Sequence, residues 1–250
     1  MTLRHLLLAA LAFLSIVHPA AAATSDNPSI TKTREHYLSG GRQITVDTFA
    51  PARPGRYPAV LVLYTSAGTL AGMGDFEGFS RSLAQRGMVA LLVHYFDRTG
   101  TFFAGDGTIG KHLHVWEDTV IDGLDFAAAH PSVNRQSIGI FGYSLGAFLA
   151  VSVASRDSRV DAVAEVAGGI FTYLGGRLRR VPPTLILHGT ADRRVNVRYA
   201  AELERVARRL GARPEVHLYP GEGHVLSSPA MADARARSLA FLSRNLRPRR

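Results

Sequence analysis

Residues 137–152, Ser-Ile-Gly-Ile-Phe-Gly-Tyr-Ser-Leu-Gly-Ala-Phe-Leu-Ala-Val-Ser, decide the fold. The first seven form a short apolar run of the kind that is buried in a sheet, and the small apolar residues after Gly146 predict a buried helix. Ser144 stands between them, at the centre of Gly-x-Ser-x-Gly. Because a serine hydroxyl is a weak nucleophile, it has to be presented on a tight strand-to-helix turn where a base can reach it. The stretch predicts such a nucleophile turn; the alternative is a structural serine in an ordinary glycine-rich turn.

Two further residues complete a catalytic pattern with Ser144. A nucleophilic serine needs a histidine base and an acid that orients it, and in folds with this turn the chain order is serine, acid, histidine. Asp192 follows the predicted strand 184–188, and His224 follows the predicted strand 215–219. Both positions lie just past the carboxyl end of a strand, where open α/β sheets form their sites. We therefore predict a triad of Ser144, Asp192 and His224, with a helix-capping acid and an exposed loop histidine as the structural alternatives.

Other residues near these positions are weaker candidates. Glu165 lies inside or near the end of the apolar run 160–167, so it is a second candidate for the acid, although a structural role is the simpler interpretation. His94 and His188 end predicted strands and are expected to pack beneath the site. The backbone N–H of Leu145, at the start of the predicted helix, is expected to stabilise an oxyanion when a carbonyl is attacked.

Strand and helix patterns alternate along the chain. Short β-rich runs predict strands at 44–49, 58–64, 88–95, 137–143, 160–167, 184–188 and 215–219. Apolar residues at helical spacing predict helices at 75–86, 115–129, 145–155, 195–210 and 230–245. This alternation predicts an α/β fold with a mostly parallel twisted sheet and helices on both faces. Since no repeat, low-complexity block or linker interrupts it, we expect a single domain over residues 24–250.

The amino terminus has the pattern of a secretory signal peptide. Arg4 and His5 precede an apolar run at residues 6–17, and the small residues 20–23 offer a cleavage site. The run is shorter than the ~20 residues that cross a bilayer, so stable membrane insertion is not expected. We predict that residues 1–23 export the protein to the periplasm or the medium.

Composition excludes several kinds of chemistry. The chain of 250 residues has no cysteine, which excludes disulfides, Cys-ligated zinc, iron–sulfur clusters and thiolate nucleophiles. Its formal net charge of +9 is mostly arginine scattered along the chain, so a solvated surface is expected and a nucleic-acid interface is not. His112 and His114 are two apart at a helix start and face different ways. No metal and no organic cofactor is predicted.

Residues 105–112 imitate a nucleotide-binding loop. The stretch Gly-Asp-Gly-Thr-Ile-Gly-Lys-His matches G-x-G-x-x-G, but the preceding strand is predicted to end near Tyr95, and His112 stands where a P-loop needs Ser or Thr. We predict a mobile loop between strand and helix that overhangs the site.

Taken together, the motifs GYSLG, HGTAD and GEGH, with Trp116-Glu-Asp118 on the preceding helix, resemble the dienelactone hydrolase family of α/β-hydrolases. The resemblance covers roughly residues 44–246. It implies the α/β-hydrolase fold, with Ser144 as nucleophile, Asp192 as orienting acid and His224 as base. It also implies that the backbone N–H of Ser66 is the second oxyanion donor.

The chain departs from the family pattern at three positions. The resemblance implies a cysteine nucleophile where this chain has Ser144, and a glutamate where it has Thr65. It also implies an arginine for the substrate carboxylate four residues beyond the histidine, where this chain has Ser228. The fold and triad carry over, but the dienelactone substrate does not.

These features predict a cofactor-independent serine hydrolase that cleaves a small-molecule carboxylic ester or lactone through an acyl-enzyme. The alternatives are the same triad acting as a peptidase or a cofactor-free perhydrolase, and a non-catalytic binding protein on the hydrolase scaffold.

Overall fold

A computed structural model describes residues 28–171 and 178–246 of the chain. The predicted signal peptide, residues 1–23, lies outside the described residues.

Eight strands form one sheet, in the order β1-β2-β4-β3-β5-β6-β7-β8. Strands β1 and β2 pair antiparallel, as do β2 and β4, and all the later pairings are parallel. The strands are β1 (Ile30–Ser39), β2 (Arg42–Pro51), β3 (Tyr57–Leu63), β4 (Val89–Val93), β5 (Val133–Tyr143), β6 (Val160–Val166), β7 (Thr184–Gly189) and β8 (Glu215–Tyr219). The predicted mostly parallel α/β architecture is confirmed.

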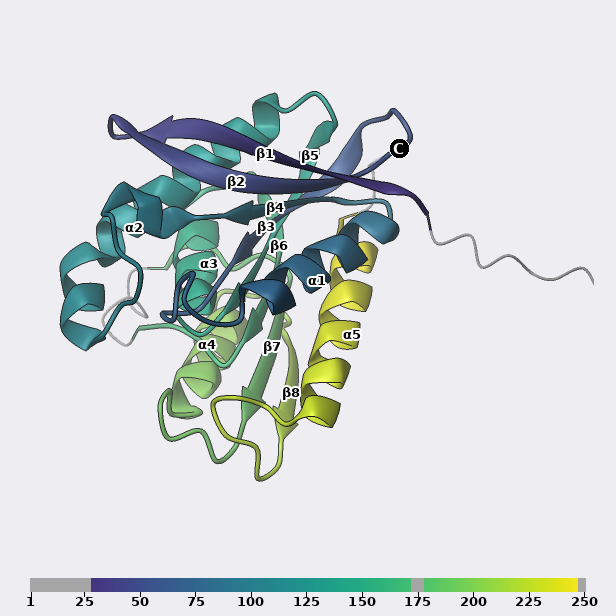
Figure 1. Ribbon diagram of the computed structural model, residues 1–250. Coiled ribbons are helices and arrows are strands. Elements are labelled where there is room, and N and C mark those ends of the chain that lie inside the picture. Colours follow the sequence, from purple (N-terminus) through teal and green to yellow (C-terminus); the bar gives the residue numbers. More distant parts are fainter. Residues whose placement is uncertain (1–27, 172–177, 247–250) are drawn as a thin grey trace, which may run out of the picture.

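In the part of the chain that the structure describes, five α-helices cover the two faces of the sheet. They are α1 (Met73–Gln85), α2 (Asp106–Ala129), α3 (Leu145–Arg156), α4 (Arg198–Arg209) and α5 (Ser228–Asn245), and a short 3-10 helix, η1 (Tyr95–Arg98), follows β4. Helices α1 and α5 lie on one face, and α2, α3 and α4 lie on the other (Figure 1). Covering both faces buries the central strands completely, which explains why β3 and β4 are continuous apolar runs without alternation.

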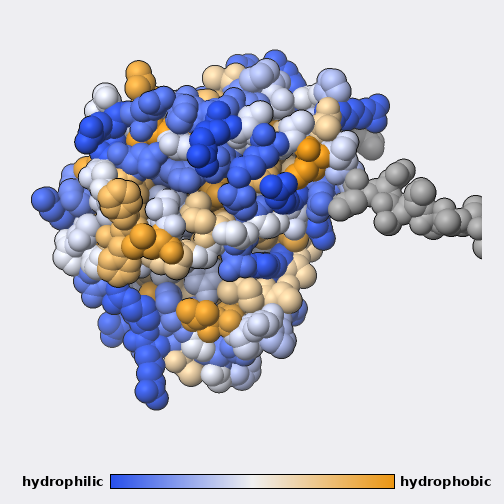
Figure 2. All heavy atoms as spheres, in the orientation of Figure 1, coloured by the Kyte–Doolittle hydropathy of each residue, from blue (hydrophilic) through white to orange (hydrophobic). Residues whose placement is uncertain are grey.

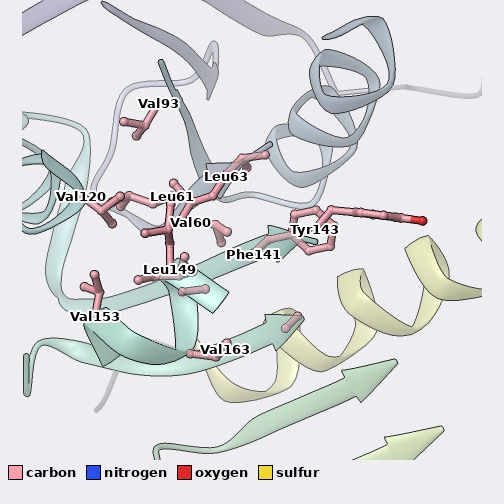
Figure 3. Close-up of a cluster of buried hydrophobic side chains, with 14 of the residues drawn as sticks. Val60, Leu61, Leu63, Val93, Val120, Phe141, Tyr143, Leu149, Val153 and Val163 are labelled. Atoms are coloured by element: carbon pink, nitrogen blue, oxygen red, sulfur yellow. The ribbon is translucent and has the colours of Figure 1, made fainter. Parts of the chain in front are cut away.

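The core lies between the central strands and these helices. Leu61 of β3, Val120 of α2 and Leu149 and Val153 of α3 are fully buried and meet on one face (Figure 3). Burying one such side chain contributes about 1.5–3 kcal/mol to folding. This packing fixes α3 against the sheet, and therefore fixes the turn that precedes α3.

The surface carries most of the charge. Figure 2 shows hydrophilic side chains over most of one face, broken by separate small apolar patches. On α4, Arg205 pairs with Glu202 at 2.6 Å and Arg208 with Glu204 at 2.8 Å. These arginines lie on a solvated helix face, in line with the solvated surface expected from the scattered arginines.

The structure differs from the sequence prediction at two elements. The sequence does not predict strand β1, because charged and polar side chains fill it and only residues near its end are buried. The strand pairs with β2 through a hairpin. The turn of this hairpin, Gly40-Gly41, has positive φ at both glycines. Residues 106–114 are helical and not a loop, so α2 begins at Asp106. The glycines there weaken helix propensity, but the hydrogen bond from Ile109 N to Gly105 O begins the helix, and the first turn is packed against the site described next.

Candidate active site

Ser144 occupies a strained turn between β5 and α3. Its φ of 54° and ψ of −117° are unusual for a residue with a side chain. The two flanking glycines are required by close backbone contacts: a Cβ at Gly142 would lie 2.2 Å from the carbonyl oxygen of Gly146, and a Cβ at Gly146 would lie 2.4 Å from that of Leu63. The turn therefore presses the start of α3 against the carboxyl end of β3.

The three residues predicted from sequence order lie in one hydrogen-bonded row. The Nε2 atom of His224 is 2.9 Å from Oγ of Ser144, and its Nδ1 atom is 2.7 Å from Oδ2 of Asp192. Ser144 and Asp192 are buried, whereas the His224 side chain is 21% exposed. The imidazole thus bridges a buried hydroxyl and a buried carboxylate while part of its own ring stays exposed.

The Asp192 carboxylate is held from both sides. Its Oδ1 atom accepts hydrogen bonds from the backbone N–H groups of Arg194 and Val195, both at 2.8 Å. Its other oxygen faces His224. The loop after β7 therefore folds around this carboxylate and fixes which oxygen faces the imidazole.

A second histidine, His188 at the end of β7, faces the same carboxylate oxygen. Its Nε2 atom is 2.9 Å from the carbonyl oxygen of Val195 and 3.3 Å from Oδ2 of Asp192. Because both neighbours are acceptors, Nε2 carries the proton, and the buried Nδ1 atom has no partner. Burial lowers the pKa of His188, so this imidazole is neutral. Sequence position places His188 beneath the site as expected, but its contact with Asp192 becomes visible only in the folded loop.

Replacing His188 with Phe is expected to lower kcat/KM about 10- to 100-fold. Asp192 then loses one of its N–H donors, and the loop after β7 loses the hydrogen bond from His188 to the carbonyl oxygen of Val195. His188→Gln, which keeps an N–H donor, should recover part of the rate. His130→Gln, at the far end of α2, is the control. An unchanged rate in His188→Phe, or no recovery in His188→Gln, would contradict a positioning role.

The backbone around Ser144 offers donors for a developing oxyanion. Leu145 is the first residue of α3, and the first N–H groups of a helix have no partner within it. Ser66 follows β3, whose end packs against the start of α3, and both Ser66 and Leu145 line the same cavity as Ser144. Ala104 N donates to the carbonyl oxygen of Ser66 at 2.9 Å and steadies that loop.

The cavity above Ser144 has a volume of about 610 Å³. One wall is aromatic: the rings of Phe148 and Phe171 stack 4.3 Å apart, and Tyr199 meets Phe148 edge-on at 5.7 Å. Hydrophobic and aromatic walls with a few polar groups are typical of small-molecule sites. These wall residues were not predicted, because they come from three separate segments.

The first turn of α2 forms the opposite side of this cavity. Asp106 forms an ion pair with Arg194, the second residue after Asp192 along the chain. Both side chains are largely exposed, and His114, about two turns further along α2, also lines the cavity. The stretch predicted as an overhanging loop thus borders the site as a helix.

Glu165, the alternative acid, does not face His224 in this arrangement. Its Oε2 atom accepts a hydrogen bond from Gly168 N at 3.0 Å, and its Oε1 atom has no partner. Burial raises the pKa of Glu165 to about 8, so at neutral pH the group is mostly a neutral carboxylic acid. A Cβ at Gly168 would lie 3.3 Å from the carbonyl oxygen of Ser144, so Glu165 supports the segment beneath the turn.

Glu165→Gln is expected to remove a pH dependence of stability. The folded-state pKa near 8 lies above the ordinary value of 4.5, so the folded chain holds this proton more tightly than the unfolded chain. The stabilisation is complete below about pH 4 and is lost as the pH rises toward 8. Glutamine cannot ionise, so the Tm of the variant relative to wild type should rise across this range, by the equivalent of several kcal/mol in unfolding free energy.

Scanning calorimetry between pH 4 and 8 measures this difference. Glu215→Gln is the control, since that side chain is half exposed on β8. If the Tm curves of wild type and Glu165→Gln run parallel, the buried carboxyl does not titrate in this range.

Within residues 28–171 and 178–246, His, Asp and Glu do not gather in groups of three or more that suit a metal ion. In the same residues, no helix combines the length and apolar character needed to cross a membrane.

A strained serine turn after β5, an acid after β7 and a histidine after β8, on a sheet of this strand order, are the arrangement of an α/β-hydrolase. The dienelactone hydrolase family matches residues 44–242, which is most of the chain. The protein belongs to the dienelactone hydrolase family.

Individual relatives are distant. The peroxisomal succinyl-coenzyme A thioesterase of Mus musculus is 29% identical over 137 residues, covering 54% of this chain and 32% of the mouse protein. The uncharacterized peptidase YtmA of Bacillus subtilis strain 168 is 24% identical over 218 residues, covering 73% of this chain and 82% of that protein. This chain spans about a third of the length of the mammalian thioesterases that it matches.

Solved structures share the fold. A dienelactone hydrolase-like promiscuous phosphotriesterase, P91, from metagenomic libraries superimposes with a TM-score of 0.76 at 18% identity, covering 87% of this chain and 99% of that one. At this identity the likeness establishes the fold alone.

Proposed function

We propose that this protein hydrolyses a carboxylic ester or lactone through an acyl-enzyme formed on Ser144. The observation that carries the proposal is the row of hydrogen bonds from Ser144 Oγ through His224 to Asp192, at 2.9 and 2.7 Å, with Ser144 lining a cavity. A serine next to a base that is oriented by a third group is the signature of nucleophilic catalysis.

In the first half-reaction, His224 Nε2 takes the proton of Ser144 as Oγ attacks the substrate carbonyl. The N–H groups of Leu145 and Ser66 stabilise the oxyanion that forms, and Asp192 holds the imidazole in the correct tautomer and stabilises its charged form. The tetrahedral intermediate then collapses, and His224 gives the proton to the leaving alkoxide.

In the second half-reaction, water enters the open cavity and attacks the acyl-Ser144 carbonyl. His224 removes a proton from that water, the same oxyanion donors act again, and the acid product leaves as Ser144 recovers its proton. In both half-reactions His224 takes up the proton and then gives it back.

The proposed substrate is an ester other than a dienelactone, because this chain differs from the family pattern at two positions. Ser228 stands at the first residue of α5, and Thr65 follows β3, where the family resemblance implies an arginine and a glutamate. The thioesterase relatives favour one extension, a thioester substrate, since the attack on the carbonyl is the same and only the leaving group changes. Peptide hydrolysis is the second candidate, favoured by the name of the Bacillus relative.

A labelling experiment combined with a substrate panel tests the proposal. Wild-type protein should react with a fluorophosphonate probe, and peptide mapping should place the probe on Ser144. Turnover of p-nitrophenyl esters should exceed that of aminoacyl p-nitroanilides, with an acyl thioester as the third arm. Faster anilide cleavage would make the protein a peptidase, and faster peracid formation with hydrogen peroxide would make it a perhydrolase. Absence of both labelling and turnover would point to a binding protein.

A further inference from the structure

A second cavity, of about 310 Å³, lies between α1 and α5 and is separate from the cavity above Ser144. We name it the side pocket and define it by six of its wall residues: Phe76 and Phe79 of α1, Phe141 and Tyr143 of β5, and Met231 and Ala234 of α5. The larger cavity is built from α2, α3 and the segments around Phe171 and Tyr199. The helices that line the two cavities lie on opposite faces of the sheet (Figure 1).

The wall of the side pocket is almost entirely hydrocarbon. Phe79 and Phe141 pack with ring centroids 4.1 Å apart, and the six residues that define the side pocket are buried or partly buried, whereas Ala71 and Val225, which also line it, are exposed. Its charged groups, Asp75 and Arg235, stand at the rim and pair with each other at 2.6 Å. Neither charge is left for a ligand inside, so the side pocket fits an uncharged apolar group.

The side pocket touches three of the four segments of the proposed catalytic machinery, all except the loop that carries Asp192. Thr65, Tyr143 and Val225 line it, and each stands next in the chain to Ser66, Ser144 or His224.

Tyr143 lines the side pocket and also contacts His224. Its side chain extends from the end of β5 toward the space between α1 and α5 (Figure 3), and its hydroxyl donates to the carbonyl oxygen of His224 at 2.7 Å. Burial raises the pKa of Tyr143 to about 12, so this hydroxyl keeps the proton that it donates. A group bound in the side pocket therefore lies against the residues that hold Ser144 and His224.

We propose that the side pocket binds the hydrocarbon chain of the ester substrate, while the larger cavity receives the other half of the ester. The inference rests on the proposed ester hydrolysis and deepens it, because it makes the substrate an ester with one apolar chain. Each methylene group that enters such a pocket contributes about 0.8 kcal/mol, which corresponds to about a fourfold rise in kcat/KM. The chain is in either the acyl or the alcohol half, and two substrate series distinguish these sources.

The test compares wild type with variants that fill the side pocket. Met231→Trp adds volume from α5, and Met231→Leu is the volume-conserving control. Ala71→Trp fills the same pocket from the exposed loop before α1, and it keeps the test valid if Met231→Trp folds poorly. One substrate series is the p-nitrophenyl esters from acetate to octanoate, and the other is the alkyl acetates from ethyl to octyl.

For wild type we expect kcat/KM to rise about fourfold per methylene in one series until the pocket is full. Met231→Trp or Ala71→Trp should keep the acetate and ethyl rates and lose at least tenfold on the six-carbon chain of that series, whereas Met231→Leu should behave as wild type. A chain-length profile that is the same in wild type and the filled variants, in both series, overturns the inference. If that profile is unchanged but acetate turnover depends on Ser144, the ester hydrolase proposal stands without the side pocket; if turnover survives Ser144→Ala, the proposed function itself fails.

Discussion

Ser144→Ala is expected to lower kcat for p-nitrophenyl acetate by about 10⁵- to 10⁶-fold, the loss typical when the nucleophile of a triad is removed. The Oγ atom that lies 2.9 Å from His224 Nε2 is the group that would attack, and alanine leaves the base and the oxyanion donors without a nucleophile. The residual rate should come from the oxyanion donors and substrate binding alone. Fluorophosphonate labelling should be lost together with the rate.

The comparison needs a variant that removes a hydroxyl elsewhere on α3. Ser155→Ala serves, because its hydroxyl donates only along the helix, to the carbonyl oxygen of Ser152 at 2.7 Å. Its activity should remain near wild type. Circular dichroism melts should show both variants folded, and Ser144→Ala should lose at most about 1 kcal/mol of stability, the usual contribution of one hydrogen bond such as that to His224. A residual kcat within tenfold of wild type would show that Ser144 is not the nucleophile.

The parts of the site that sequence predicts best are those encoded locally. The turn at Ser144 needs a buried strand, two glycines and a small-residue helix, and all three are contiguous in the chain. Asp192 and His224 are far from Ser144 in sequence, but each follows a strand of the same parallel sheet. Because the carboxyl ends of parallel strands meet at one edge, chain order alone brings these side chains together.

Contacts that depend on loop paths and helix packing could not be predicted in this way. His188 contacts Asp192 only because the loop after β7 folds back and brings the Asp192 carboxylate to His188 Nε2. The first turn of α2 reads as a glycine-rich loop, and tertiary packing overrides that weak propensity. The Gly40-Gly41 hairpin was within reach of sequence reasoning, because two consecutive glycines between polar strands are a hairpin signal.

The side pocket shows the same limit. Its walls come from α1, β5 and α5, whose apolar residues read only as core in the sequence. Periodicity identifies which residues turn inward, but it does not say whether neighbouring helices pack fully or leave a space between them.

Asp192→Asn is expected to lower kcat/KM by about 10⁴-fold while leaving the fold intact. Asparagine keeps one acceptor oxygen, and the backbone N–H groups of Arg194 and Val195, both 2.8 Å from Oδ1, hold that oxygen on their side. The new NH₂ group then faces His224 Nδ1, so this nitrogen becomes an acceptor and the ring proton moves to Nε2. A protonated Nε2 donates toward Ser144 and can no longer take its proton.

The same geometry lets the Asp192→Asn result distinguish the two candidates for the orienting acid, Asp192 and Glu165. His188 Nε2–H would also meet an NH₂ group in place of Oδ2, which is a donor against a donor, so the loss in Asp192→Asn should exceed the loss in His188→Phe. If Glu165 were the orienting acid, Asp192→Asn would stay within tenfold of wild type and Glu165→Gln would carry the 10⁴-fold loss instead. The hydrogen bond of 2.7 Å from His224 to Asp192, and the raised pKa that keeps Glu165 neutral, favour Asp192. Steady-state kinetics of the two variants, with melting curves to establish folding, therefore assigns the acid.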